Sequence, residues 1–233
     1  MNKALKNTLI ILGVILLIII IVLIALGVMP GISQSKDLGV KYTQQDLDNY
    51  YQKANYQVKE LPAGSKPSIR FTGSQQVNVA WTDEELTARM NNDKWINHPA
   101  KNVQIKINAD GTVQASAMIS KTKAVAAAQS FGFPGSEIKM AQDFIKYLPE
   151  EIPVYIQGDI QIKDNRIVSY KLDEAKVGNL SLLNFVKVGQ IVDYAQSHLR
   201  TNPAFNIKSL DFDNGQMKFE GSHPTLKENV VGY

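Results

Sequence analysis

The 233-residue chain contains no cysteine and only three histidines. The absence of cysteine excludes disulfide bonds, thiolate metal sites and cysteine nucleophiles, so the fold must be stabilised by its core alone. His98, His198 and His223 lie far apart and show no metal-ligand spacing. The sequence also lacks the nucleophile, phosphate-loop, zinc-protease and calcium-loop motifs. We therefore expect no metal, no cofactor and no enzymatic activity.

Residues 9–29 contain no charged and no strongly polar side chain. A helix rises about 1.5 Å per residue, so roughly 20 apolar residues cross about 30 Å of hydrocarbon. The run therefore predicts one transmembrane signal-anchor helix. A cleaved signal peptide is the alternative, because residues 25–27 form a small-x-small site, but its apolar region normally has only about 7–15 residues. An acylated anchor is excluded because the chain has no cysteine to modify.

The flanking charges predict the orientation of this helix. Lys3 and Lys6 precede it, whereas Lys36 and Asp37 follow it and cancel. Since lysine and arginine resist translocation, we expect a single-pass protein of the cell membrane with a cytoplasmic N-terminus and an extracellular C-terminal domain. The predicted parts are a cytoplasmic tail (1–8), the transmembrane helix (9–29), a linker (30–36), one extracytoplasmic domain (37–221) and a C-terminal tail (222–233).

The charge balance argues against nucleic acid as a partner class. Lysine and arginine number 25 and aspartate and glutamate 22; without Lys3, Lys6 and Lys36, the remainder is 22 against 22. The exported part is therefore neutral and has no excess of basic residues for phosphate backbones. The lipid bilayer is the partner that the sequence predicts directly, and we expect no nucleic-acid binding.

Alternating apolar residues and turn signals predict a mainly antiparallel sheet after residue 68. Hairpin turns are expected at Asp110-Gly111, Asp164-Asn165 and Asn214-Gly215, because these residues tolerate positive φ angles. Gly158 lies in phase with the buried side chains of its strand and predicts a bend or a close approach. A change of parity near Lys208-Ser209 predicts a bulge.

Helices are predicted where capping residues precede apolar periodicity. These patterns start at Thr43 and Thr82, and a further alanine-rich helix covers residues 123–130. The longest soluble helical pattern covers residues 181–200. Together the elements predict an α+β domain in which a curved, mainly antiparallel sheet wraps a long helix, with additional shorter helices.

Five small or apolar residues are candidates for the lining of a groove. Leu182, Leu183 and Val186 lie off the main apolar stripe of the predicted long helix, as expected of a helix that lies against a lipid-like ligand or of one that is simply buried in the core. Ala115 and Ala117 are small inward residues that leave room above their strand. The alternative is a neighbouring helix that packs closely on the two alanines.

Phe131 and Phe133 form a separate candidate in the segment 131–135, which combines two aromatic residues with glycine and proline. We consider them as a loop that contacts lipid or covers a pocket. The alternative interpretation is ordinary burial of the two rings in the core.

The order of these elements resembles a known group of proteins. It starts at Trp81-Thr82-Asp83-Glu84-Glu85-Leu86, passes the Asp110-Gly111 and Asp164-Asn165 turns and Val177-Gly178, and ends with a hairpin over residues 205–221. This order resembles YpmS-like, single-span bacterial envelope proteins, which are similar to tubular lipid-binding (TULIP, BPI-like) domains. In those domains a curved antiparallel sheet wraps a long helix and encloses an apolar groove. The resemblance implies lipid binding or handling, covers most of residues 75–221 and carries no catalytic residue.

We therefore expect a membrane-anchored extracytoplasmic protein that holds a lipid or a lipid-linked envelope precursor in an apolar groove. One alternative is a non-catalytic interaction module that binds other envelope proteins during cell-envelope assembly. A second alternative is a hydrolase whose carboxylates assemble from distant segments. An apolar groove favours the first function, a flat exposed patch the second, and a cleft of convergent carboxylates and histidine the third.

Overall fold

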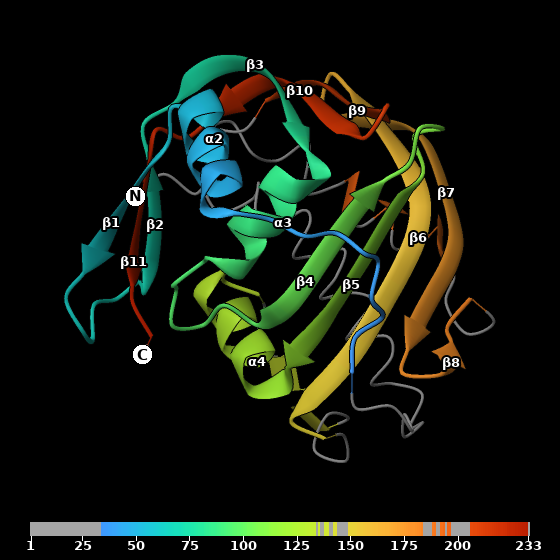
Figure 1. Cartoon of the computed structure of the whole chain (residues 1–233). Helices are drawn as coiled ribbons and strands as arrows, with labels where there is room; N and C mark the ends of the chain where they lie inside the picture. Colours follow the sequence, from blue (N-terminus) through green and yellow to red (C-terminus); the bar gives the residue numbers. More distant parts are fainter. Residues whose placement is uncertain are drawn as a thin grey trace.

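The computed structural model describes residues 34–133, 135, 138–139, 142–143, 149–183, 188–189, 192–193, 195–196 and 206–232. Within these residues the chain is an α+β fold with one large curled sheet, one small sheet and three named helices (Figure 1). The helices are α2 (Gln44–Ala54), α3 (Asp83–Asn91) and α4 (Lys121–Ser130).

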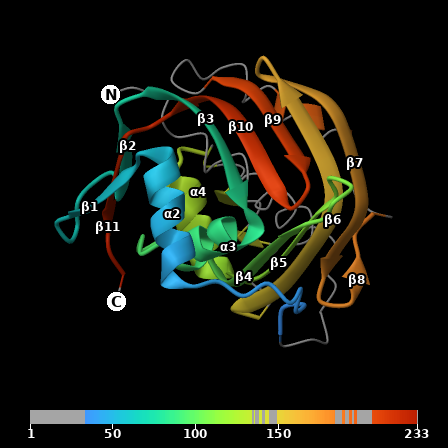
Figure 2. The same cartoon turned by 45° about the horizontal axis from the view of Figure 1, so that its top comes forward.

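The large sheet is antiparallel and has the strand order β3-β10-β9-β6-β5-β4, with β7 also paired to β6 and β8 to β7. Figure 2 shows how the sheet curls, so that β3 and β10 lie across from β4 and β5. Its strands are β3 (Gln75–Thr82), β4 (Ala100–Ile107), β5 (Val113–Ser120), β6 (Glu151–Lys163), β7 (Arg166–Val177), β8 (Leu180–Ser181), β9 (Ile207–Asp213) and β10 (Gln216–His223).

The turn residues adopt the conformations that the sequence predicts. Asp164 and Asn165 have φ angles of 49° and 58°, as a two-residue hairpin between β6 and β7 requires. Asn214 and Gly215 have φ angles of 49° and 77° between β9 and β10, and Gly111 has 84°. The three predicted hairpins are thus present, although the connection at Asp110-Gly111 is a longer loop over residues 108–112, in which Gly111 but not Asp110 has a positive φ angle.

Two irregularities allow the long strands to bend. The pairing of β6 with β7 shifts at Gly158, and a Cβ atom on this glycine would lie 2.2 Å from the Lys171 carbonyl oxygen. In β9, Lys208 is the extra residue, because Ser209 pairs with Glu220 while Ile207 pairs with Gly221. Both predicted irregularities are confirmed, and both increase the local curvature of the sheet.

Capping boxes start the first two helices as predicted. The Asp46 carboxylate accepts from the Thr43 backbone N–H at 2.7 Å at the start of α2. At the start of α3, the Thr82 hydroxyl accepts from the Glu85 N–H, and the Glu85 carboxylate accepts from the Thr82 N–H. α4 includes the predicted helix 123–130 and begins two residues earlier.

The small sheet corrects the expectation of a C-terminal tail over residues 222–233. Its order is β1-β11-β2, with strands β1 (Gln57–Leu61), β2 (Ile69–Thr72) and β11 (Leu226–Val230). β11 is therefore a central strand, parallel to β1 and antiparallel to β2. Lys227 and Asn229 are each only 1% exposed. Because polar residues occupy buried positions of this strand, it lacks the apolar alternation that would have predicted it.

The predicted helix over residues 181–200 does not begin at Ser181. Ser181 belongs to β8 and pairs with Lys176, and the Leu182 N–H donates to the Ala175 carbonyl oxygen at 2.8 Å. Ser181 and Leu182, which helical periodicity assigned to the first turn of the helix, are therefore bound to β7 instead. Residues 188–189, 192–193 and 195–196 are helical, and the other residues of 184–200 lie outside the described part of the chain.

The predicted membrane anchor cannot be compared with the structure, since residues 1–33 lie outside the described ranges. Among the helices of the described residues, none is both long enough and apolar enough to cross a bilayer.

Candidate functional site

The large sheet is curled, and we call its concave face the inner face. This face is apolar across four strands. Ile105, Ala115, Ile156 and Ala175 are direct cross-strand partners from β4 to β7, so their side chains lie on one face. The next row consists of Ile107, Val113, Gly158 and Leu172, and a third contains Ala117, Val154 and Val177. Such rows are the apolar surface that the sequence predicts.

Burial along this face is uneven. Ala117, Val154 and Val177 are 3–4% exposed near the end of β5. Other side chains of the inner face, all on β5, β6 and β7, are only half-buried. We call these residues the apolar strip: Val113, Ala115, Ile156, Ile160 and Leu172. Tyr170, the cross-strand partner of Ile160, is 45% exposed. By contrast, Ile105 and Ile107 of β4 and Ile162 of β6 are only 3–4% exposed. The inner face is thus partly accessible only along the apolar strip.

The structure brings four of the five candidate groove residues to one apolar cluster. Ala117 and Leu182 are 4% and 0% exposed within it, and Ala115 and Leu183 are half-buried against it. Val186 lies outside the described residues. Ala115 is therefore the candidate that belongs to the apolar strip, whereas Leu182 is enclosed by the core.

Phe131 and Phe133 are both half-buried. The Phe131 ring centroid lies 5.2 Å from that of Trp95, and Phe133 packs against the same apolar cluster as Ala117. Both rings thus contact the core in this structure.

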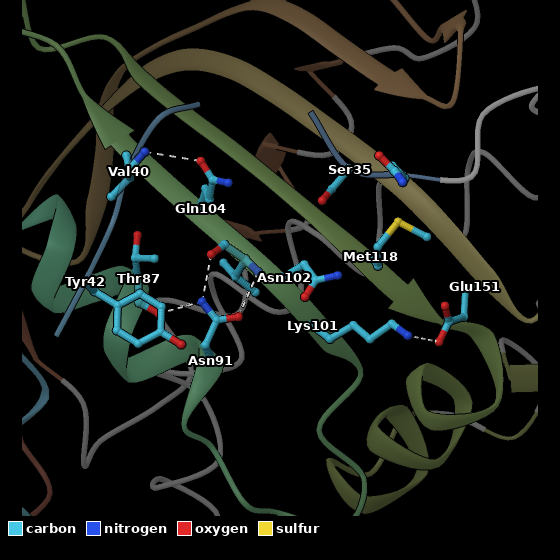
Figure 3. A pocket seen from close by; sticks show the side chains of 12 residues that line it. Ser35, Val40, Tyr42, Thr87, Asn91, Lys101, Asn102, Gln104, Met118 and Glu151 are labelled. Atoms are coloured by element: carbon cyan, nitrogen blue, oxygen red, sulfur yellow. Dashed lines mark hydrogen bonds and ion pairs between the residues drawn. The ribbon is translucent and has the colours of Figure 1, made fainter. Parts of the chain in front are cut away.

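A second concave site lies on the outer face of β4 and β5, and sequence reasoning missed it. This polar pocket of about 450 Å³ is lined by Gln34, Ser35, Val40, Tyr42, Thr87, Asn91, Lys101, Asn102, Val103, Gln104, Met118 and Glu151 (Figure 3). The Asn91 side chain accepts from the Val103 N–H at 2.9 Å and donates to its carbonyl oxygen at 2.7 Å. Lys101 forms an ion pair with Glu151 at the pocket's other end.

One wall of the polar pocket comes from residues 34–42, which we call the strap. The Gln104 side-chain oxygen accepts from the backbone N–H groups of Leu38 at 2.7 Å and Val40 at 3.3 Å. The Lys36 ammonium lies 3.7 Å from the centroid of the Tyr155 ring. Leu38 is 8% exposed. The strap is therefore bound to the sheet by hydrogen bonds, a cation–π contact and burial.

A buried charged cluster connects α3 to the small sheet. The Asp93 carboxylate lies 3.1 Å from Arg89 Nη1 and 2.5 Å from Lys227 Nζ, and the three side chains are at most 4% exposed. Burial opposes ionisation of Asp93, but the two cations hold the pKa of Asp93 well below its ordinary value. Burial lowers the pKa of Lys227 to about 8, against the attraction of Asp93. Because one carboxylate forms ion pairs with two cations, this cluster connects α3 to the small sheet.

The described residues contain no group of three or more histidine, aspartate or glutamate side chains that could hold a metal ion. The most perturbed carboxyl pair outside the cluster is Asp83 with Glu84 at the start of α3. Burial, followed by the hydrogen bond with Glu84, raises the pKa of Asp83 to about 6. Both residues belong to the first turn of a helix, where carboxylates also stabilise the helix dipole.

Comparisons of the chain with protein-family models, with curated proteins and with solved structures found no match. A function must therefore be inferred from the chain's own residues.

Proposed function

We propose that the protein is anchored in the cell membrane by residues 9–29 and binds a lipid, or a lipid-linked envelope precursor, on the apolar strip of its extracytoplasmic domain. The observation that carries this proposal is the partial exposure of the strip on the inner face of a curled sheet. A concave apolar surface is the form that most small-molecule sites take. The resemblance to YpmS-like and tubular lipid-binding proteins supports the same function.

The composition of the strip suits an acyl chain. Ala115 is small beside its larger neighbour Ile156, and the adjacent rows consist of apolar residues. Each methylene that leaves water contributes about 0.8 kcal/mol, so ten methylenes contribute about 8 kcal/mol before the cost of association. An acyl chain could therefore bind without any charged group on the strip.

The interaction-module alternative has less support. Apart from Tyr170, which lies beside the apolar strip, the exposed large apolar residues of the described chain are Tyr42 in the strap, Val58 in β1, Ile96 in a loop and Val168 in β7. Single exposed apolar residues are normal on soluble surfaces, and a docking site requires a contiguous patch. We therefore keep lipid binding as the function that the geometry favours.

Photo-crosslinking tests the proposal. The full chain is reconstituted in vesicles that contain a phospholipid with a diazirine on its acyl chain, and crosslinked peptides are mapped by mass spectrometry. We expect crosslinks on peptides of β5, β6 and β7 in addition to the anchor. Ala115→Phe should reduce them several-fold, because the new ring fills the strip.

Lys106→Phe is the matched control, because Lys106 pairs with Gln114 on the outer face of the same strands and is exposed. It should leave the crosslinks unchanged. If Ala115→Phe lowers the melting temperature, Leu172→Asn removes apolar contact without adding volume and serves as the second variant. Crosslinks confined to the anchor in the wild-type protein would refute lipid binding by the domain.

A further inference from the structure

The strap fixes where the chain enters the folded domain. In Figure 1 it crosses β4 and β5 before it reaches α2, and its contacts are with Gln104 of β4 and Tyr155 of β6. Beneath it, outer-face side chains that would otherwise meet water are buried: Ser116 is 1% exposed and Tyr155 4%. Residues 34–42 are therefore part of the domain, including residues 34–36, which the sequence assigned to the linker.

The strap begins at one particular end of the large sheet. Gln34 and Ser35 line the polar pocket together with Met118 and Glu151 (Figure 3). Met118 lies two residues before the end of β5, and Glu151 is the first residue of β6. We call this end of the sheet, where β5 ends and β6 begins, the strap end.

The predicted anchor leaves little freedom between the strap end and the bilayer. Five residue steps separate Met29, the last residue of the predicted span, from Gln34, so the connection extends at most about 17 Å. β6 has 13 residues and runs from Glu151 at the strap end to Lys163. At about 3.3 Å per residue, its two ends are about 40 Å apart along the strand. The connection can therefore hold one end of β6 near the bilayer while the other end lies well away.

Charge at the strap end favours the same orientation. Lys36, Lys101, Lys121 and Lys123 lie there with the acidic residues Asp37, Glu150 and Glu151. Basic groups close to a membrane are attracted to anionic headgroups within about a Debye length. The excess of lysine is small, so this attraction contributes less to the orientation than the short connection does.

We propose that the strap end is the surface through which the domain contacts the bilayer, with the turn between β6 and β7 directed away from it. This inference rests on the membrane anchor in the proposed function. It adds an orientation that is independent of whether the apolar strip holds a lipid.

Energy transfer to the membrane measures this orientation, and the chain is suited to it because it contains no cysteine. Glu151→Cys and Lys163→Cys place a single thiol at either end of β6. The full chain is reconstituted in vesicles of phosphatidylethanolamine and phosphatidylglycerol with acceptor-labelled lipid, and a membrane-impermeant maleimide donor labels outward-facing domains. We expect transfer from residue 151 to be at least about twofold more efficient than from residue 163, given the separation of about 40 Å.

An insertion variant tests the cause. About 20 glycine and serine residues between Gly31 and Ile32 form a flexible coil with a typical end-to-end distance of about 25 Å and a much longer reach. This insertion should bring the two transfer efficiencies together. A persistent difference would overturn the short connection as the cause.

Equal transfer from residues 151 and 163 in the uninserted chain, when it floats with the vesicles, would overturn the orientation and leave the anchor intact. If the chain does not float with vesicles at all, the anchor in the proposed function is wrong instead. The two failures are therefore distinguishable in one experiment.

Discussion

His223, at the end of β10, is a buried histidine whose surroundings favour the neutral ring. Its ring centroid lies 5.0 Å from that of Tyr56 at an interplanar angle of 83°, and the side chain is 7% exposed. The Nδ1 atom lies 2.7 Å from the Pro224 carbonyl oxygen, and since a carbonyl only accepts, Nδ1 donates. Burial lowers the pKa of His223 to about 4; the Pro224 hydrogen bond opposes this change and the Arg89 charge reinforces it.

This environment predicts acid destabilisation. Between pH 6.5 and about 4 the histidine is protonated in the unfolded chain but neutral in the folded one, so stability falls as the pH decreases through this window. The expected loss from this group is about 3 kcal/mol, because one pKa unit corresponds to about 1.4 kcal/mol. Urea unfolding of the full chain in detergent at several pH values measures it.

His223→Gln is the control, because it keeps an amide donor for the Pro224 carbonyl and does not titrate. The pKa of His98 is also lowered by burial, whereas that of Asp83 is raised, so other groups contribute slopes of both signs. Both remain in the variant, and the difference between the two proteins isolates His223. Identical pH slopes for the two proteins would contradict the assignment.

At the scale of elements, the sequence predicts a helix, strand or turn correctly when neighbouring residues specify it, and fails when contacts with distant residues do. The Asp164-Asn165 turn is specified by two adjacent residues that tolerate positive φ, so it was predictable. β11 was not, because its buried Lys227 is stabilised by Asp93, 134 residues away in the sequence. Ser181 was assigned to a helix because periodicity does not reveal that β7 offers it a strand partner.

The same distinction applies to the site. The inward position of Ala115 follows from alternation within one strand, and cross-strand pairing with Ile156 then extends the apolar face. The polar pocket depends on Gln104 accepting from Leu38, 66 residues earlier. No local pattern in residues 34–42 indicates that contact, so the sequence predicted residues 34–36 as the end of a linker and residues 37–42 only as the start of the domain.

Gly158 provides a prediction for the longest hairpin. A Cβ atom at this position would lie 2.2 Å from the Lys171 carbonyl oxygen, and backbone cannot yield as a flexible side chain can. We therefore expect Gly158→Ala to destabilise the protein by about 1–3 kcal/mol through overpacking. Gly135→Ala is the matched control, because a methyl group added there would have no neighbour within 4 Å and the residue is helical. Equal melting temperatures for the two variants would show that β6 and β7 can separate without cost.

At the scale of the molecule, the two sheets form one body because β11 and α3 share the buried charged cluster. Asp93 follows α3, which packs along β4 of the large sheet, and Lys227 lies in the centre of the small sheet. The Trp95 side chain, 4% exposed, packs between Ile69 of β2 and Ala127 of α4. Loss of either partner of a buried ion pair leaves an uncompensated charge, so the two sheets should unfold together.

Removal of residues 224–233 tests this coupling. The deletion takes away β11, which pairs with both β1 and β2, and also the bridge between Trp95 and Val231. Both remaining strands of the small sheet then lose their partner, and Asp93 loses one of its two cations. Since a domain of this size is stable by only about 5–15 kcal/mol, we expect the truncated chain to lose cooperative thermal unfolding altogether.

Lys227→Met is the control that removes the charge of Lys227 but keeps β11. The pairing of β11 with its neighbours is retained, and Asp93 still has its ion pair with Arg89. This variant should therefore have a lower melting temperature but preserve a cooperative transition. A truncated chain that still unfolds cooperatively at the wild-type temperature would show instead that the large sheet is an independent unit and that the small sheet is an appendage to it.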